Sequence, residues 1–305
     1  MNQSATASAQ QSSSTFLIWT ALSAVYLIWG STYLAIRFTV ETTPPFLSAA
    51  ARFIASGIVL YLVRRIAGDP EPSKLEWRNA TVIGILLLVG GNGAVVWAAR
   101  YIPSSLAALL VATCPLWMLL FDFLRPGGEK PGPRALLGIL IGFCGALLLI
   151  GWSADGTSEN SFIGAIVVVL GSLFWAAGSI YGKTAKLPSS PLLITAMEML
   201  TGGAVLLIIA LAIGEVSSFS LPEVSSRSAL AWIYLTVIGP IAFVSYAWLL
   251  RNAPIPLVST YSYVNPLVAI LLGYFLGKEV LALRVLIAAG LIIGSVVLVS
   301  ARKTR

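Results

Sequence analysis

Ten apolar segments, each about as long as a helix that crosses a lipid bilayer, occupy most of this 305-residue chain. A helix needs about 20 apolar residues to span a hydrocarbon core about 30 Å thick. The segments are 16–36, 46–63, 80–99, 104–124, 134–151, 162–182, 191–213, 229–250, 255–276 and 282–300. Charged residues make up only 10% of the chain, too few to cover the surface of a soluble protein of this length. We therefore predict an all-α integral membrane protein with ten transmembrane helices.

Several classes of chemistry are excluded by composition. The chain has no histidine, which removes His-based acid–base catalysis and most transition-metal sites. Its two cysteines, Cys114 and Cys144, lie in apolar segments, where we expect them to act as small packing residues. The basic residues are scattered rather than gathered in a stripe, which argues against nucleic acid as a partner. We expect no metal, no cofactor and no enzymatic activity.

The loops between these segments are short, and their basic residues are unevenly distributed. The clearest polar stretches are 69–78, 125–134 and 153–160, and none could hold a soluble domain. With the N-terminus inside the cell, 13 Lys and Arg residues lie in cytoplasmic segments and five in outer ones, as the positive-inside rule requires. We predict that both termini are cytoplasmic, with a disordered polar tail over 1–15 and a basic tail over 301–305.

A motif in the first half of the chain recurs in the second. Trp97, Arg100, Pro103, Leu106, Pro115 and Leu116 recur at an offset of 151 as Trp248, Arg251, Pro254, Leu257, Pro266 and Leu267. We predict two five-helix repeats, 16–151 and 162–300. Because five is odd, the second repeat starts on the opposite side of the bilayer and the two halves are inverted. Inverted repeats are typical of transporters that work by alternating access, with the substrate site near the midplane between the halves.

The same residues carry a resemblance to a known family. Gly30, Ser31 and Tyr33 in the first span recur as Gly178, Ser179 and Tyr181 in the sixth, and Glu129 and Glu279 follow spans four and nine. Together with Tyr101–Leu110 and Pro115, these motifs resemble the drug/metabolite transporter superfamily, and within it the ten-helix EamA-type exporters, over residues 16–300. More narrowly, the chain is similar to the bacterial aromatic amino-acid exporters of that family.

This resemblance implies a basket of ten helices around a central cavity in the bacterial inner membrane. It also implies export of amino acids or other small metabolites. Four-helix multidrug members of the superfamily exchange protons through an acidic residue in their first span. Spans one and six of this chain contain no acidic residue, so the resemblance does not extend to that mechanism.

Prolines and glycines within the spans are candidate hinges. Pro115 and Pro266 each remove a backbone N–H and free a carbonyl one turn earlier, near Val111 and Ser262. Such carbonyls could bind a substrate ammonium group, and the alternative is a kink supported by neighbouring helices. Each glycine weakens a helix by about 1 kcal/mol relative to alanine, which marks a flexible or closely packed point. The candidate hinge residues are Gly90, Gly91, Gly93, Pro115, Gly239, Pro240 and Pro266.

Aromatic and amide side chains deep in the spans are candidates for substrate contact. Trp and Tyr offer flat apolar area with a polar tip, which suits an aromatic or apolar amino acid, and Asn can both donate and accept hydrogen bonds. The alternative for each residue is packing or an interhelical hydrogen bond. The candidates, drawn first from spans that carry the repeated motif, are Asn92, Trp97, Trp117, Trp175, Tyr246, Tyr261, Tyr263 and Asn265.

Two charged residues lie deep within spans. Arg52 lies in the second span and Glu198 in the seventh, each about 10 Å from its membrane surface at 1.5 Å per residue. For Arg52 we expect a structural ion pair or a side chain that reaches the surface. Glu198 is the only deep acidic residue and the candidate for proton coupling, with a structural ion pair as the alternative.

These observations favour an exporter of neutral, aromatic or hydrophobic amino acids that works by alternating access. We expect binding to use aromatic walls, Asn and backbone groups rather than a formal ion pair, and we expect the protein to function as a monomer. An exporter of the same fold for drugs, nucleosides or sugar-linked metabolites is the first alternative. An intramembrane enzyme and a passive channel are remote alternatives, because the chain lacks paired intramembrane carboxylates and a polar pore-lining stripe.

Overall fold

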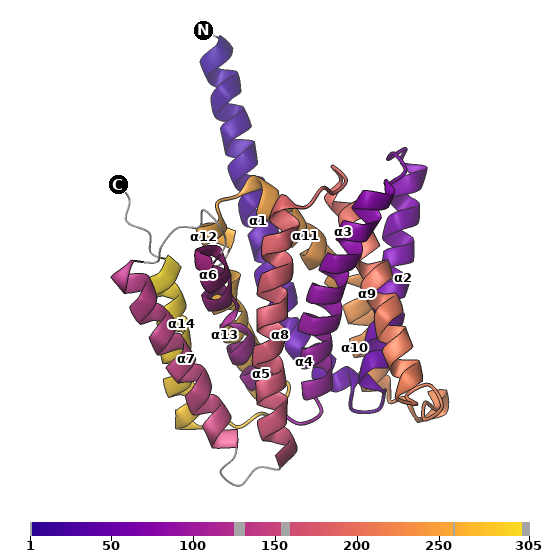
Figure 1. The fold of residues 1–305 in the computed structure, drawn as a ribbon, viewed down its shortest axis with the longest axis vertical. Coiled ribbons are helices and arrows are strands. Elements are labelled where there is room, and N and C mark those ends of the chain that lie inside the picture. The colour runs from indigo at the N-terminus through magenta and orange to yellow at the C-terminus, as the bar shows by residue number, and fades with distance from the viewer. Residues whose placement is uncertain (1, 125–131, 154–158, 259, 301–305) are drawn as a thin grey trace.

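The computed structural model describes residues 2–124, 132–153, 159–258 and 260–300, and every regular element within these ranges is a helix (Figure 1). In chain order they are α1 (Asn2–Thr39), α2 (Pro45–Ile66), α3 (Lys74–Gly84), the π-helix η1 (Ile85–Asn92), α4 (Gly93–Ala98), α5 (Ser104–Val111), α6 (Cys114–Leu124), α7 (Pro133–Ser153), α8 (Glu159–Thr184), α9 (Pro191–Ala212), the short 3₁₀-helix η2 (Leu221–Glu223), α10 (Ser226–Val237), α11 (Gly239–Asn252), α12 (Ile255–Val258), α13 (Tyr261–Phe275) and α14 (Leu283–Ser300).

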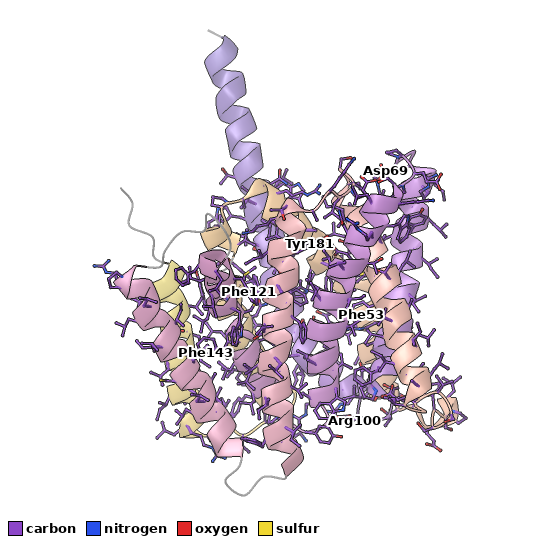
Figure 2. All side chains as sticks on the ribbon, in the orientation of Figure 1. Phe53, Asp69, Arg100, Phe121, Phe143 and Tyr181 are labelled. Atoms are coloured by element: carbon purple, nitrogen blue, oxygen red, sulfur yellow. The ribbon has the colours of Figure 1, made fainter. Side chains whose placement is uncertain are left out.

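The predicted helical membrane fold is confirmed. Seven helical segments in the described part of the chain are long and apolar enough to cross a membrane. Three shorter apolar helices, Leu136–Leu149, Tyr261–Phe275 and Leu283–Leu298, lie in the remaining predicted spans. Asp69 and Arg100 lie at opposite ends of the bundle, with Phe53 and Phe143 between them (Figure 2).

Several helices begin at signals that are visible in the sequence. Ser73 precedes α3 and forms a capping box with Glu76, in which each side chain accepts from the other residue's backbone N–H. Ser190 precedes α9, and its hydroxyl accepts a hydrogen bond from Leu193 N at 3.4 Å, with Pro191 as the first helical residue. Such caps satisfy backbone donors at the membrane surface and allow the connections to be short.

The helices pack in a regular set of pairs. α2 packs on α9, and α7 packs on α14. α1 contacts α10, α11 and α13, whereas α8 contacts η1, α4, α5 and α6. α1 and α8 therefore each pack on several other helices, while the α7 and α14 pair forms one side of the bundle (Figure 1).

The backbone departs from the sequence prediction at three places. α1 is helical from Asn2, although residues 1–15 were predicted to be disordered; residues 2–14 contain neither proline nor glycine, so nothing in them stops the helix. Pro115 lies in the first turn of α6, where a missing N–H costs little, rather than within a continuous helix. The junction at Ile238 between α10 and α11 places Gly239 and Pro240 at the start of a helix, whereas Pro266 lies inside α13.

Candidate functional site

Five aromatic rings meet in the middle of the bundle. They come from four helices: Trp29 on α1, Trp175 on α8, Phe243 and Tyr246 on α11, and Tyr261 on α13. The Trp29 ring lies 4.9–5.5 Å, centroid to centroid, from the other four rings, mostly in edge-to-face geometry. We call these five residues the aromatic cluster. It joins helices from both halves of the chain at one point.

A central pocket with about 560 Å³ of atom-free space lies beside this cluster. Its lining is Trp29, Thr32, Tyr33, Ile36, Gly91, Asn92, Val95, Val111, Gly171, Ser172, Trp175, Phe243 and Tyr261. Aromatic and aliphatic side chains predominate, and a few hydroxyl and amide groups stand among them. Small-molecule sites commonly combine apolar walls with a small number of placed polar groups.

The backbone beside the pocket is irregular and tightly packed. η1 is an eight-residue π-helix that ends at Asn92, and π-helical turns often occur at functional sites. A Cβ added at Gly90 would lie 2.7 Å from Phe174 Cγ, and one at Gly91 would lie 2.8 Å from Trp175 Cε3. These two glycines therefore allow η1 to pack closely on α8. Their predicted hinge role, and that of Gly93, stays a prediction.

Asn92 is linked to the deep charge on α2. The Arg52 guanidinium donates a hydrogen bond to Asn92 Oδ1 at 2.5 Å, and its Cζ lies 4.4 Å from the centre of the Phe53 ring. Arg52 is only 4% exposed. The expected ion pair is not formed, because no carboxylate in the described residues lies within salt-bridge distance of Arg52.

A second pocket, with about 1030 Å³ of atom-free space, lies toward the end of the bundle that holds Lys183 and Arg251. We call it the inner pocket. Glu198 lines it together with these two cations, and Arg251 Nη1 also donates to the Pro188 carbonyl at 3.0 Å. Phe243 lines both pockets, so the aromatic cluster separates the inner pocket from the central one.

The predicted binding residues fall into two groups. Asn92, Trp175 and Tyr261 line the central pocket, and Tyr246 belongs to the aromatic cluster and lines the inner pocket. The other four line neither pocket. Trp97 packs on Tyr101, Trp117 packs on Phe143, and the Asn265 amide nitrogen can donate to the main-chain oxygens of Tyr26 and Tyr261. The role of all eight residues in binding stays a prediction.

Sequence reasoning left three central residues off the list of binding candidates. Trp29 and Phe243 belong to the aromatic cluster, and Arg52 holds Asn92. Trp29 directly precedes the Gly30 motif of the first span, a signal that could have placed it near the centre. No sequence signal distinguishes Phe243 from the other phenylalanines in apolar spans.

At the opposite end of the bundle, Glu279 is surrounded by hydrogen-bond donors. Ser104 donates to Oε1 from its backbone N–H at 2.8 Å and its hydroxyl at 2.7 Å, Ser105 donates to Oε2 from the same two groups, and Arg37 Nη1 forms a salt bridge. Burial raises the pKa of Glu279, but the hydrogen bonds from Ser105 and Ser104 outweigh it, so the pKa is lowered. Its predicted counterpart, Glu129, lies outside the described residues.

Comparison with known proteins agrees with a transporter fold. The chain is 41% identical over 285 residues to the uncharacterized inner membrane transporter YedA of Escherichia coli K12, covering 93% of this chain and 90% of that protein. It is 26% identical to the protein PecM of Dickeya dadantii, covering 90% and 92% of the two chains. One solved structure, described only as a crystal structure of a protein, superposes with a TM-score of 0.64 at 22% identity over 94% of this chain and 97% of its own, and shows the fold alone.

A family model decides the assignment. The model of the EamA-like transporter family matches two stretches, residues 15–151 and 162–301. Together with the helical membrane fold and the relationship to an inner membrane transporter, this match identifies a multi-pass membrane transporter. The chain belongs to the EamA-like transporter family of the drug/metabolite transporter superfamily.

Proposed function

We propose that this transporter exports neutral amino acids with aromatic or other hydrophobic side chains. The observation that carries this proposal is the central pocket, where four rings of the aromatic cluster and the amide of Asn92 line one space. Rings can enclose an apolar side chain, while amide and hydroxyl groups can hold the polar end of the molecule.

We further propose that two inverted five-helix repeats move by alternating access. The packing supports this, because exchanging each span for its predicted counterpart reproduces the main contacts. α2 meets its counterpart α9, α7 meets α14, and the contacts of α1 with α11 and α13 correspond to those of α8 with η1 and α6. Predicted substrate sites of such transporters lie between the halves, where the aromatic cluster lies.

The proposed orientation gives the inner pocket a role in export. With both termini in the cytoplasm, the end of α8 that carries Lys183 lies on the cytoplasmic side. Substrate would then enter through the inner pocket and reach the central pocket past Phe243, which lines both.

The test is uptake of labelled amino acids by proteoliposomes that contain the purified protein. The panel is Phe, Trp, Thr, Met, Leu, Lys and Glu, with and without an imposed pH gradient. We expect saturable transport of the neutral members, strongest for Phe and Trp. Stimulation by the gradient would support proton coupling through Glu198, and transport of none of the panel would contradict an amino-acid substrate.

The site is tested by substitution. Trp175→Ala removes one wall of the central pocket, and we expect about a fivefold or greater loss of transport with normal folded yield, because about 1 kcal/mol or more of aromatic contact is removed. Trp77→Ala is the control, since Trp77 packs against Tyr61 away from both pockets. Equal transport by both variants would contradict the site.

A further inference from the structure

Arg52 is a buried positive charge without a negative partner among the described residues. It lies on α2, is 4% exposed, and has no carboxylate within salt-bridge distance in the part of the chain that the structure describes. Its one side-chain hydrogen bond within the described residues goes to the neutral amide oxygen of Asn92. A charge held inside a membrane bundle is costly unless another charge or several dipoles compensate it, and such residues commonly mark a binding site.

The surroundings of Arg52 offer little further compensation. A small space beside it is lined by mainly aliphatic side chains, among them Ile36, Val40 and Val96. The hydroxyl of Thr39 in the same lining donates to its own helix, at the carbonyl of Ala35. The only ring contact that Arg52 makes among the described residues is with Phe53, which is neutral.

The hydrogen bond from Arg52 fixes how Asn92 faces the central pocket. A guanidinium has only donors, so the atom that it meets must be the amide oxygen of Asn92. The amide nitrogen, which has two donor hydrogens, is then the part of the side chain left to contact a ligand in the pocket. No hydrogen bond from this nitrogen is formed within the described residues.

A second donor lies in the same pocket. The hydroxyl of Tyr33 makes no hydrogen bond with the described residues, and Tyr33 lines the central pocket with Asn92. The Asn92 amide and the Tyr33 hydroxyl are two available donors, and the buried guanidinium of Arg52 lies behind Asn92. This side of the pocket is therefore electropositive and favours a negatively charged group. Ile36 lines both the central pocket and the space beside Arg52, so the cation adjoins the pocket wall.

We infer that Asn92 and Tyr33 bind a carboxylate group of the transported molecule, and that Arg52 is a positioning residue that orients the Asn92 amide and supplies the positive charge. This inference rests on the proposed function and deepens it: the cargo carries a carboxylate at the α2 and η1 side of the pocket and an apolar group against the aromatic cluster. Neutralisation of Arg52 is completed by the cargo rather than by the protein.

The experiment compares ligands that differ only at their charged ends. 3-Phenylpropionate has the carboxylate without the ammonium group, and phenylalaninamide has the ammonium group without the carboxylate. Thermal unfolding of the detergent-purified full chain is measured with each compound, so the assay does not depend on transport. We expect 3-phenylpropionate to raise Tm at concentrations at which phenylalaninamide has no effect, and to compete with labelled Phe in proteoliposomes.

Variants separate charge from packing. Arg52→Gln is expected to weaken 3-phenylpropionate binding 10- to 100-fold and to abolish the preference over the amide, and Arg52→Lys is expected to restore part of that preference. Arg64→Gln on the same helix is the matched control, because Arg64 pairs with Asp69 at the end of α2, and it should keep the preference. A structural role of Arg52 would lower Tm without changing the preference between the two ligands.

Three outcomes would overturn the inference. Equal stabilisation of the wild-type chain by the acid and the amide would contradict carboxylate recognition, as would no stabilisation by either. An unchanged preference in folded Arg52→Gln would contradict the role of Arg52. If 3-phenylpropionate binds with the expected preference but no amino acid is transported, the carboxylate site stands and only the amino-acid cargo is wrong.

Discussion

Glu279 and Arg52 are both buried charges, but the protein satisfies them very differently. Glu279 receives four hydrogen bonds from Ser104 and Ser105 and a salt bridge from Arg37. Among the described residues, Arg52 donates a side-chain hydrogen bond to one partner, the amide oxygen of Asn92. Both oxygens of the carboxylate are therefore occupied, whereas most donors of the guanidinium have no partner in the described residues.

The difference separates a structural charge from one that is available to a ligand. Glu279 connects the end of α1 to the first residues of α5 and to the segment after α13, so its charge is used to fix three elements. Within the described part of the chain, Arg52 connects only α2 and the end of η1, beside a pocket. A fully satisfied charge stabilises one arrangement, and an incompletely satisfied one favours a partner that completes it.

The largest effect is expected from Glu279→Gln. The neutral amide cannot pair with Arg37, and its nitrogen cannot accept from Ser105, so buried donors lose their partner. Removing one member of a buried, hydrogen-bonded charge cluster costs roughly 3 kcal/mol. We expect a clear fall in Tm, measured by thermal unfolding in detergent. Glu41→Gln is the control, because the exposed Glu41–Arg227 pair, at 3.5 Å, contributes at most about 1 kcal/mol. Equal losses in the two variants would contradict the comparison.

Acid should have a smaller effect in the same direction. The pKa of Glu279 is below its ordinary value of 4.5, so its stabilisation is complete above that value and is lost as pH falls through the folded-state pKa. A protonated carboxyl still accepts some hydrogen bonds, so the loss is smaller than in Glu279→Gln. We expect Tm of the wild-type chain to fall below about pH 4.5 and the Gln variant to lack this component.

Glu215 sharpens this measurement because its pKa is shifted upward, opposite to the shift of Glu279. Burial raises its pKa, partly offset by a hydrogen bond from Leu47 N. The folded state therefore favours protonated Glu215, and its contribution to stability grows as pH falls through the raised pKa. Glu215→Gln should make the acid loss due to Glu279 steeper, and a shallower profile would contradict the assignment.

The sequence predicted the membrane fold well because span length and hydropathy are local properties. Segment 191–213 coincides with α9 to within one residue, and Ser190 and Pro191 mark its start. Irregular backbone was predicted only in part: the glycines at 90 and 91 indicated a special point in span three, but not a π-helix over Ile85–Asn92.

The site was less predictable because a span that is apolar all round does not reveal which face is buried. Trp117 and Trp175 are equivalent candidates in the sequence, yet Trp117 packs on Phe143 and Trp175 lines the central pocket. The contact between Arg52 and Asn92 joins residues 40 positions apart on different helices, and neither position indicates the other. Such pairings depend on helix rotation, which hydropathy does not specify.

The smallest expected change in stability comes from giving Arg52 a partner of opposite charge, as Glu279 already has in Arg37. Asn92→Asp places a carboxylate where the amide oxygen now accepts from the guanidinium, with no change in side-chain size. A charged hydrogen bond in place of a neutral one should add about 1 kcal/mol, seen as a rise in Tm.

The same substitution should inhibit binding of the cargo. Aspartate removes the amide donors from the pocket and occupies the positive charge, so 3-phenylpropionate should no longer stabilise the variant. Asn92→Leu is the matched control, since it removes the donors without supplying a charge and should lower both Tm and ligand binding. If Asn92→Asp both raises Tm and abolishes ligand binding, the wild-type chain leaves Arg52 incompletely paired at a cost in stability. The reason would be that the partner of Arg52 is the transported molecule. If Asn92→Asp lowered Tm, the guanidinium would already be satisfied and the contrast with Glu279 would be wrong.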